Sequence, residues 1–209
     1  MNPSIKAIVT AVVAFGLFLA LGFNATRAGE PALFVGWEVA LANHSSLVAW
    51  WLTWVCYPQV LGPIAVALLV VAWRAPSWRS RILLSVVMLL LCWRGADLFQ
   101  HLFMRPRRLD WVVRHETSFS YPSSHAAIAT GFYALWAGML YASSLPGWVR
   151  RVVAPCLLLS ALGVGWSRLA LGAHYLTDLL GGVLLAVALV AAALAVIPVK
   201  VLAPPAGRP

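Results

Sequence analysis

Three short polar segments interrupt an otherwise apolar sequence, and their residue types are suited to phosphoryl transfer. Arginine guanidinium groups and serine hydroxyls bind the oxygens of a tetrahedral anion, whereas histidine can act as a nucleophile or move a proton. The combination predicts a site that holds a phosphate group and transfers it. The segments are Arg105-Pro106-Arg107-Arg108, then Tyr121-Pro122-Ser123-Ser124-His125, then Ser167-Arg168 followed by His174 and Asp178.

The third segment contains a possible nucleophile and its supporting groups. His174 and Asp178 are four residues apart at the expected start of the last helix, so they share a helix face. The carboxylate can accept a hydrogen bond from one imidazole nitrogen and leave the other free to attack. Arg168 lies just before a short connection that contains Gly172, which brings its guanidinium near His174. A His-Asp pair that ties a helix end and an interfacial arginine would give the same pattern.

The second segment directly precedes an apolar stretch that is expected to be helical. A serine at this place can cap the helix, and the free N–H groups of the first turn can bind a phosphate. His125, on that first turn, would be placed to protonate a leaving oxygen. An ordinary serine cap followed by a surface histidine is the alternative interpretation.

Composition places these segments in a membrane protein. The chain has 209 residues, of which 62% are hydrophobic and only 10% are charged, so a soluble globular domain is excluded. Apolar stretches long enough to cross about 30 Å of hydrocarbon predict an all-α, six-helix transmembrane bundle in one domain over residues 1–209. The first stretch is also compatible with a signal peptide, although its length favours an uncleaved helix. The expected spans are Ile5–Phe23, Leu52–Trp73, Ile82–Phe103, Ala126–Ser143, Val152–Trp166 and Tyr175–Val199.

Charge distribution predicts the orientation of the bundle. The net charge of +9 comes from arginines clustered between apolar stretches, which indicates membrane topology rather than nucleic-acid binding. Six spans put both termini on one side, and the positive-inside rule makes that side cytoplasmic. All three polar segments then lie on the opposite, periplasmic or extracellular face. Five arginines there depart from the rule and call for a functional explanation: Arg105, Arg107, Arg108, Arg114 and Arg168.

Polar residues also occur near the outer end of the third span. Asp97, Gln100 and His101 are costly in a membrane and could therefore serve function. A pairing of Asp97 with Arg94, or extension of these side chains to the interface, explains them equally well. The connection from Leu109 to Tyr121 is expected to cover the site.

The three segments resemble the signature of the type 2 phosphatidic acid phosphatase superfamily. Its third part, Ser-Arg, five residues, His, three residues and Asp, is matched in full. Its second part, Pro-Ser-Gly-His, appears with Ser124 in place of glycine. Its first part, Lys, six residues and Arg-Pro, keeps Arg105-Pro106 but has Leu98 where lysine is expected. The sequence does not decide which residue supplies the missing charge, and the candidates are Arg94, Arg107 and Arg108.

This resemblance implies a role for each matched residue. His174 would be the nucleophile, Asp178 its orienting group and His125 the general acid, without a metal or a cofactor. The substrate would be a lipid phosphate or diphosphate, such as undecaprenyl diphosphate, phosphatidylglycerol phosphate or phosphatidate, hydrolysed through a phosphohistidine in a bacterial inner membrane. The implied phosphate-binding residues are Arg105, Ser123, Ser124 and Arg168.

Two alternative functions stay open. Because the first-part lysine is absent, the phosphate could pass to another lipid, such as lipid A, instead of to water. A small ion or anion transporter would also use arginines and histidines at the mouth of a bundle. A transport path predicts polar residues across the whole bilayer, whereas the halves of the spans away from the polar segments are almost wholly apolar.

Overall fold

A computed structural model describes residues 2–43, 46–107 and 118–197, and within them all regular structure is helical. This confirms the expected all-α class. The elements are α1 (Pro3–Ala28), α2 (Ala32–Leu41), α3 (Leu47–Trp54), α4 (Pro58–Arg74), η1 (Pro76–Trp78), α5 (Arg79–Phe103), α6 (Ser124–Ile128), η3 (Ala129–Ala134), α7 (Leu135–Tyr141), η4 (Val149–Val153), α8 (Ala154–Ala170) and α9 (Leu176–Val196).

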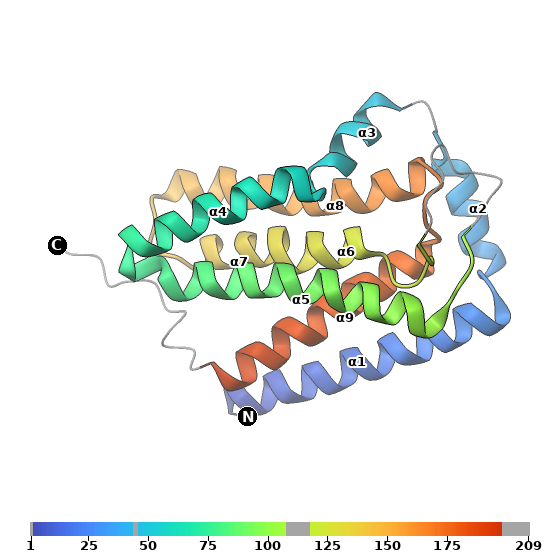
Figure 1. The fold of residues 1–209 in the computed structure, drawn as a ribbon, viewed down its shortest axis with the longest axis horizontal. Coiled ribbons are helices and arrows are strands. Elements are labelled where there is room, and N and C mark those ends of the chain that lie inside the picture. The colour runs from blue at the N-terminus through green and yellow to red at the C-terminus, as the bar shows by residue number, and fades with distance from the viewer. Residues whose placement is uncertain (1, 44–45, 108–117, 198–209) are drawn as a thin grey trace.

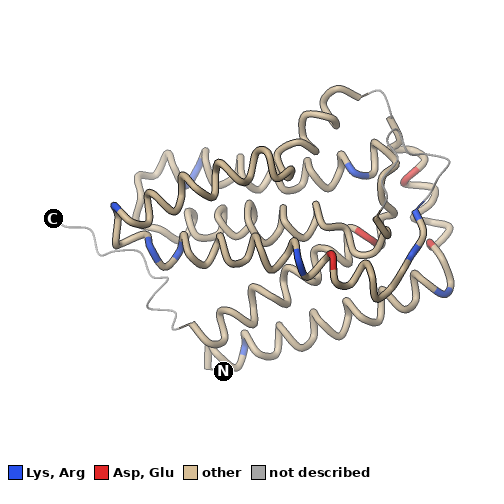
Figure 2. Tube along the Cα trace, viewed as in Figure 1, with Lys and Arg blue, Asp and Glu red and all other residues tan. Residues whose placement is uncertain are grey.

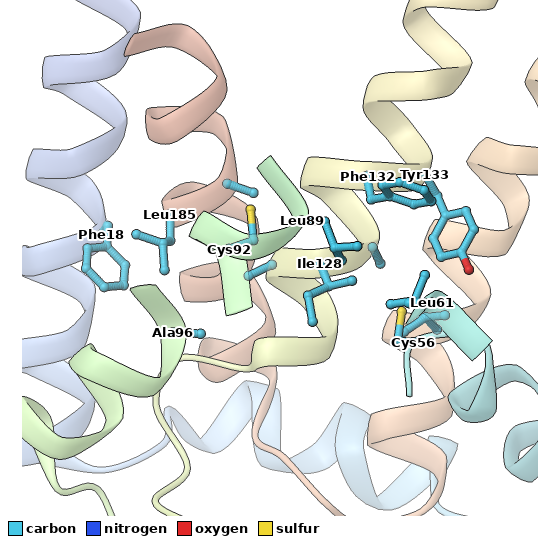
Figure 3. Packing of buried hydrophobic residues seen from close by; sticks show 14 of the residues in the cluster. Phe18, Cys56, Leu61, Leu89, Cys92, Ala96, Ile128, Phe132, Tyr133 and Leu185 are labelled. Carbon is cyan, nitrogen blue, oxygen red and sulfur yellow. The ribbon is translucent and has the colours of Figure 1, made fainter. Parts of the chain in front are cut away.

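The long helices run side by side and form a bundle with two distinct ends (Figure 1). The N-terminus and the last turn of α9 lie at one end, whereas α2 and α3 lie at the other. A core of apolar side chains joins the helices: Phe18 of α1 packs near Leu185 of α9 and Cys92 of α5, and the same cluster continues to Phe132 of η3 (Figure 3). Burial of these residues fixes how the helices sit relative to one another.

The expected count of six spans is not confirmed. Among the described residues, four helical stretches are long and apolar enough to cross a membrane: Pro3–Ala28, Pro76–Phe103, Val149–Ala170 and Leu176–Val196. A fifth is possible if α3 and α4, which are bent by 40° at their junction, form one span. Pro58 begins α4 at this bend, because proline has no N–H for a continuous helix but suits a first turn.

Two other expectations about the spans need correction. The expected span Ala126–Ser143 is helical, but it is divided into α6, the π-helical segment η3 and α7. π-Helical turns add a residue to the ordinary repeat and so interrupt a regular α-helix. The expected span Leu52–Trp73 is also divided, because α3 ends at Trp54 and α4 begins at Pro58. The connection before that span contains α2 and the first turn of α3. Val199, the expected end of the last span, lies outside the described residues.

Glycines of α9 allow the second polar segment to lie directly against that helix. Tyr121 is fully buried, and its hydroxyl donates to the Phe18 carbonyl at 2.6 Å. The Ser123 N–H donates to the Asp178 carbonyl at 3.0 Å. A Cβ atom on Gly182 would lie 2.5 Å from the Ser123 carbonyl oxygen, which is backbone and cannot rotate away. Residues 121–125 therefore require glycine at this point of α9.

This contact predicts the effect of a methyl group on α9. The Gly182→Ala substitution should destabilise the fold by about 2 kcal/mol, because the added carbon overlaps backbone. The expected result is a lower midpoint of thermal unfolding in detergent. Gly138→Ala on α7 is the matched control, since no heavy atom lies within 4 Å of its new Cβ. Equal midpoints for the two variants would contradict the predicted overlap.

Candidate active site

The connection between α8 and α9 holds Arg168 and His174 close together. Gly172 has a φ of 67°, a left-handed conformation that favours glycine. The Ala173 N–H donates to the Arg168 carbonyl at 3.0 Å, and the Gly172 N–H donates to the Leu169 carbonyl at 2.9 Å. These two bonds form a Schellman motif, which ends α8 in one sharp turn. This turn therefore fixes the position of His174 relative to Arg168.

Two contacts fix the proton position on the His174 imidazole. Nδ1 lies 3.3 Å from Oδ2 of Asp178, and Nε2 lies 3.2 Å from Nη1 of Arg107. An ionised carboxylate only accepts hydrogen bonds, and a guanidinium only donates them. Nδ1 must then carry the proton, and Nε2 must present its lone pair. This is the tautomer that a histidine nucleophile needs.

Electrostatics keep that imidazole uncharged. Burial first, and then the guanidinium of Arg107, lower the pKa of His174 to about 4, although Asp178 opposes the shift. The lone pair on Nε2 therefore remains available at neutral pH. An uncharged imidazole among positive groups also leaves the site with an unbalanced positive charge that suits an anion.

Asp178 is the most enclosed group of the site. Its side chain is fully buried, and four donors surround the carboxylate. Besides His174, these are the N–H of Tyr175 at 2.9 Å, Nη1 of Arg105 at 2.6 Å and the hydroxyl of Ser120. Such saturation is what a buried charge requires. Asp178 is therefore held rigidly as the support of His174.

Arg105 lies behind Asp178 instead of beside the attacking nitrogen. Its side chain forms ion pairs with Asp178 and with Glu30, the latter at 2.9 Å, and only 3% of the residue is exposed. Nη1 also donates to the Thr177 hydroxyl at 2.7 Å, and the guanidinium lies 4.0 Å from the centre of the Tyr175 ring. Both terminal nitrogens of the guanidinium, Nη1 and Nη2, thus donate hydrogen bonds to protein groups in this conformation.

Two glutamates bind the first turn of α9 beside the site, and the sequence motifs did not identify them as site residues. Glu30 accepts from the Thr177 N–H at 3.0 Å, and Glu38 accepts from the Leu176 N–H at 2.7 Å. Carboxylates at the first turn of a helix satisfy its free N–H groups and its dipole. No motif contains these residues, and the one signal for them was that acids are rare in this chain.

His125 has a polar atom that the protein leaves unsatisfied. Ser123 caps α6 by accepting from the Ala126 N–H, and His125 follows on the first turn. The imidazole lies edge-on to the Tyr57 ring, with 5.2 Å between ring centres. Its buried Nε2 atom has no hydrogen-bond partner among the residues that the structure describes. A buried nitrogen of this kind requires a ligand or a water molecule.

Arg168 connects the two histidines electrostatically. The residue is 3% exposed, and Nη1 donates to the Thr53 hydroxyl at 2.9 Å. Burial, followed by the charge of Arg168, holds the pKa of His125 well below its usual range, and the same charge contributes to the lowered pKa of His174. The structure therefore brings Arg107, Arg168, His125 and His174 into one electrostatic group.

The candidates for the missing lysine lie in different places. Arg107 contacts His174 and is held through the carbonyls of Ser118 and Ala173. Arg94 lies on the outside of α5, with its guanidinium 4.9 Å from the centre of the Trp93 ring. Arg108 and most of the expected covering connection fall outside the described residues. Of the three candidates for the missing lysine, Arg107 is thus the one that the structure places beside His174.

The polar residues near the end of α5 separate into two groups. Gln100 is buried and donates to the Pro122 carbonyl at 2.9 Å, so it supports the second polar segment. Asp97 and His101 are exposed, and their side chains lie 3.9 Å apart. Of the two structural explanations considered for these residues, the pairing of Asp97 with Arg94 does not form. Gln100 therefore supports the site, whereas Asp97 and His101 lie outside it.

An apolar cavity of about 250 Å³ adjoins His125. Ser124 and His125 form its polar end, and the rest is lined by apolar residues of α4, α5 and their neighbours. Such a space suits a hydrocarbon chain attached to a bound polar group. Of the described residues, no group of three or more His, Cys, Asp or Glu side chains is placed to hold a metal ion.

The chain is similar to known proteins in its sequence profile and in its fold. A comparison with curated proteins finds no match. Among solved structures, the chain is similar to the first transmembrane PAP2 type phosphatidylglycerolphosphate phosphatase from Bacillus subtilis, at 25% identity and a TM-score of 0.66. The match covers 86% of this chain and 92% of that one. This similarity supports a membrane protein with lipid phosphatase activity in general. The sequence profile of the PAP2 superfamily matches residues 97–201, half of the chain and all three polar segments, so the protein belongs to the PAP2 superfamily.

Proposed function

We propose that the protein hydrolyses a lipid phosphate or diphosphate through a phosphohistidine on His174. The observation that carries this proposal is the state of the imidazole: Nδ1 is bonded to Asp178, and Nε2 presents a lone pair beside Arg107. Few structural roles require an uncharged, buried histidine between a carboxylate and a guanidinium. A nucleophile does require it.

The reaction would take place in two steps. Nε2 of His174 attacks phosphorus, and a nitrogen–phosphorus bond forms as the bond from phosphorus to the leaving oxygen breaks. Burial, followed by the neighbouring positive charges, lowers the pKa of His125, and an anionic phosphate bound beside it would favour its protonated form. His125 then gives its proton to the leaving oxygen. Water then attacks the phosphohistidine, passes a proton to His125 and releases phosphate.

Arg107 would replace the charge of the missing lysine. Its Nη1 atom lies 3.2 Å from the attacking nitrogen, so small movements of its side chain would place it on the phosphate oxygens. Arg168 would hold the same phosphate from the other side, with the Ser123 and Ser124 backbone at the start of α6. Arg105 would act on the reaction through Asp178, because it is bonded to that carboxylate.

The substrate would be a lipid, because the apolar cavity begins at His125, the residue proposed to protonate the leaving oxygen. The chain attached to that oxygen would then occupy the cavity. Undecaprenyl diphosphate, phosphatidate and phosphatidylglycerol phosphate, the last named for the Bacillus subtilis phosphatase, are the lipids to test.

The site would face the periplasm or the exterior of a bacterial inner membrane. Basic residues gather at the end of the bundle that holds the N-terminus, away from the site (Figure 2). The positive-inside rule favours a cytoplasmic position for that end. The residues are Lys6, Arg74, Arg79, Arg81, Arg150 and Arg151.

The first test is phosphate release by the purified protein in detergent with EDTA, using each of the three lipids. The His174→Ala substitution should lower the rate about 10³-fold or more, because the nucleophile is lost. His101→Ala is the matched control, since this histidine is exposed and outside the site. Acid-labile phosphate on His174 should be detected after rapid quenching. A protein that releases no phosphate, or a fully active His174→Ala variant, would overturn the proposal. A phosphorylated lipid in place of free phosphate would indicate transfer.

The acid limb of kcat/KM should report the unusual state of His174. Because the pKa of this free imidazole is about 4, activity should persist well below pH 6.5 and fall only as protonation removes the nucleophile. Arg107→Gln removes a cation that lowers this pKa, so the limb should move to higher pH. Arg27→Gln, an exposed arginine on α1, is the control. Titration of the substrate is the same for every variant, so an unshifted limb in Arg107→Gln would contradict the assignment.

Filling the cavity should discriminate between long and short substrates. Gly62 lines the cavity, and no heavy atom lies within 4 Å of a Cβ added there. Excluding about two methylenes of the lipid from the cavity would lower kcat/KM for a long-chain lipid about tenfold in Gly62→Leu. Hydrolysis of a short-chain phosphate should be unaffected. Gly138→Leu, also in open space, is the control. Equal losses on both substrates would argue against this location of the chain.

A further inference from the structure

Helix α5 carries charged residues well away from both of its ends (Figure 2). Arg94 is fifteen residues from the start of α5 and nine from its end. At 1.5 Å per residue, it lies about 22 Å and about 13 Å from those ends. Asp97 is one turn nearer to the site. Both residues therefore lie at a depth where a membrane-spanning α5 is surrounded by hydrocarbon.

These two residues and His101 share one face of the helix. Spacings of three, four and seven residues place them within about 60° around the helix axis. The face points away from the protein, since the side chains of Asp97 and His101 are 51% and 68% exposed. Leu98 and Leu102 are exposed beside them. The face is thus polar at its centre and apolar around it.

The chain itself does not neutralise this face. In the described part of the chain, Arg94 contacts the Trp93 ring and forms no ion pair with an acid. The side chain of Asp97 reaches only His101, at 3.9 Å. Ionised groups inside a membrane normally face the protein interior or pair with one another, because hydrocarbon does not solvate them. A partner outside this chain would supply the opposite charges that Arg94 and Asp97 need.

We propose that this face of α5 binds the same face of a second copy of the protein. Two copies inserted in the same direction are related by a twofold axis along the membrane normal, so their α5 helices run in parallel. Arg94 of each copy would pair with Asp97 of the other. The offset of three residues is about 4.5 Å along the axis. The Cβ atom of Asp97 tilts toward the helix N-terminus, which brings its carboxylate nearer to the level of Arg94. The long arginine side chain spans the rest of the offset.

The surface beside the charged residues can receive a neighbouring helix. A groove of about 620 Å³ lies between α1, α5 and α9, and Arg94 is on its wall. Small residues line part of it, including Ala11, Gly95 and Ala188. Small residues allow helices to approach closely in membranes. Leu98 and Leu102 of the second copy would pack in this groove, and the pairs of Arg94 with Asp97 would form beside it.

Disulfide cross-linking in proteoliposomes at low protein density tests the proposal. Leu98→Cys places a thiol on the proposed face, in a Cys156→Ala background, because Cys156 is the exposed native cysteine and Cys56 and Cys92 are buried. The matched control is Leu159→Cys on α8, which is exposed to a similar degree, 64% against 57%. Leu98→Cys should give a dimer under oxidation at least about tenfold faster than Leu159→Cys, since only specific pairing keeps the thiols together. Equal rates would overturn the proposal and leave lipid as the cover of this face.

Charge exchange tests the pairing itself. Arg94→Asp or Asp97→Arg alone would place like charges opposite each other and lower Leu98→Cys cross-linking about tenfold. The double substitution Arg94→Asp with Asp97→Arg should restore it, because every pair is re-formed with reversed sign. Cross-linking that ignores the single exchanges, or a double exchange that does not recover, would refute the pairing. If a single variant fails to insert, the comparison of Leu98→Cys with Leu159→Cys still decides whether the face is an interface.

Discussion

The buried carboxylate of Asp178 is the group on which the rest of the site depends. It accepts from His174, Arg105, Ser120 and the Tyr175 backbone, and so it joins the first and third polar segments, together with the residue just before the second, through one charge. A buried charge is tolerated only when it is fully bonded, and removal of one partner leaves the others uncompensated. The arginine behind it is in turn balanced by Glu30. Each of these groups therefore has a fixed position before any phosphate arrives.

This arrangement separates two kinds of arginine. Arg105 is neutralised by carboxylates and supports the orientation of the imidazole, whereas Arg107 and Arg168 act on uncharged histidines. The supporting side of the site holds one guanidinium and the two carboxylates that bind it, whereas the side facing the histidines is positive. A phosphate group would enter the positive side and restore balance there. Orientation by Arg105 and anion binding by Arg107 would thus be carried by different residues, although the two lie only two positions apart in the sequence.

Much of the fold followed from apolar length. Stretches of about twenty apolar residues predicted the helices now seen as α1, α5, α8 and α9 within a few residues of their ends. The six-span count was not confirmed, because length does not show where a helix breaks. Pro58 separates α3 from α4, and η3 interrupts the helical stretch after His125. The short helix α2 was missed, since ten mostly apolar residues in a connection give no clear periodic signal.

The sequence alone determined which chemical groups were available, and it predicted that His174 and Asp178 lie close together. The shared helix face expected for them is not seen, because α9 begins at Leu176 and His174 precedes its N-cap residue Tyr175. The sequence also showed that a lysine was missing. Tertiary structure decided how the groups are used. Only the packing of distant segments could show that Glu30 neutralises Arg105 and that Arg107 reaches His174. Only burial could show that the His125 nitrogen has no partner in the described structure. Spacing along a chain fixes neighbours within one helix, but contacts between helices depend on how side chains fill the space between them.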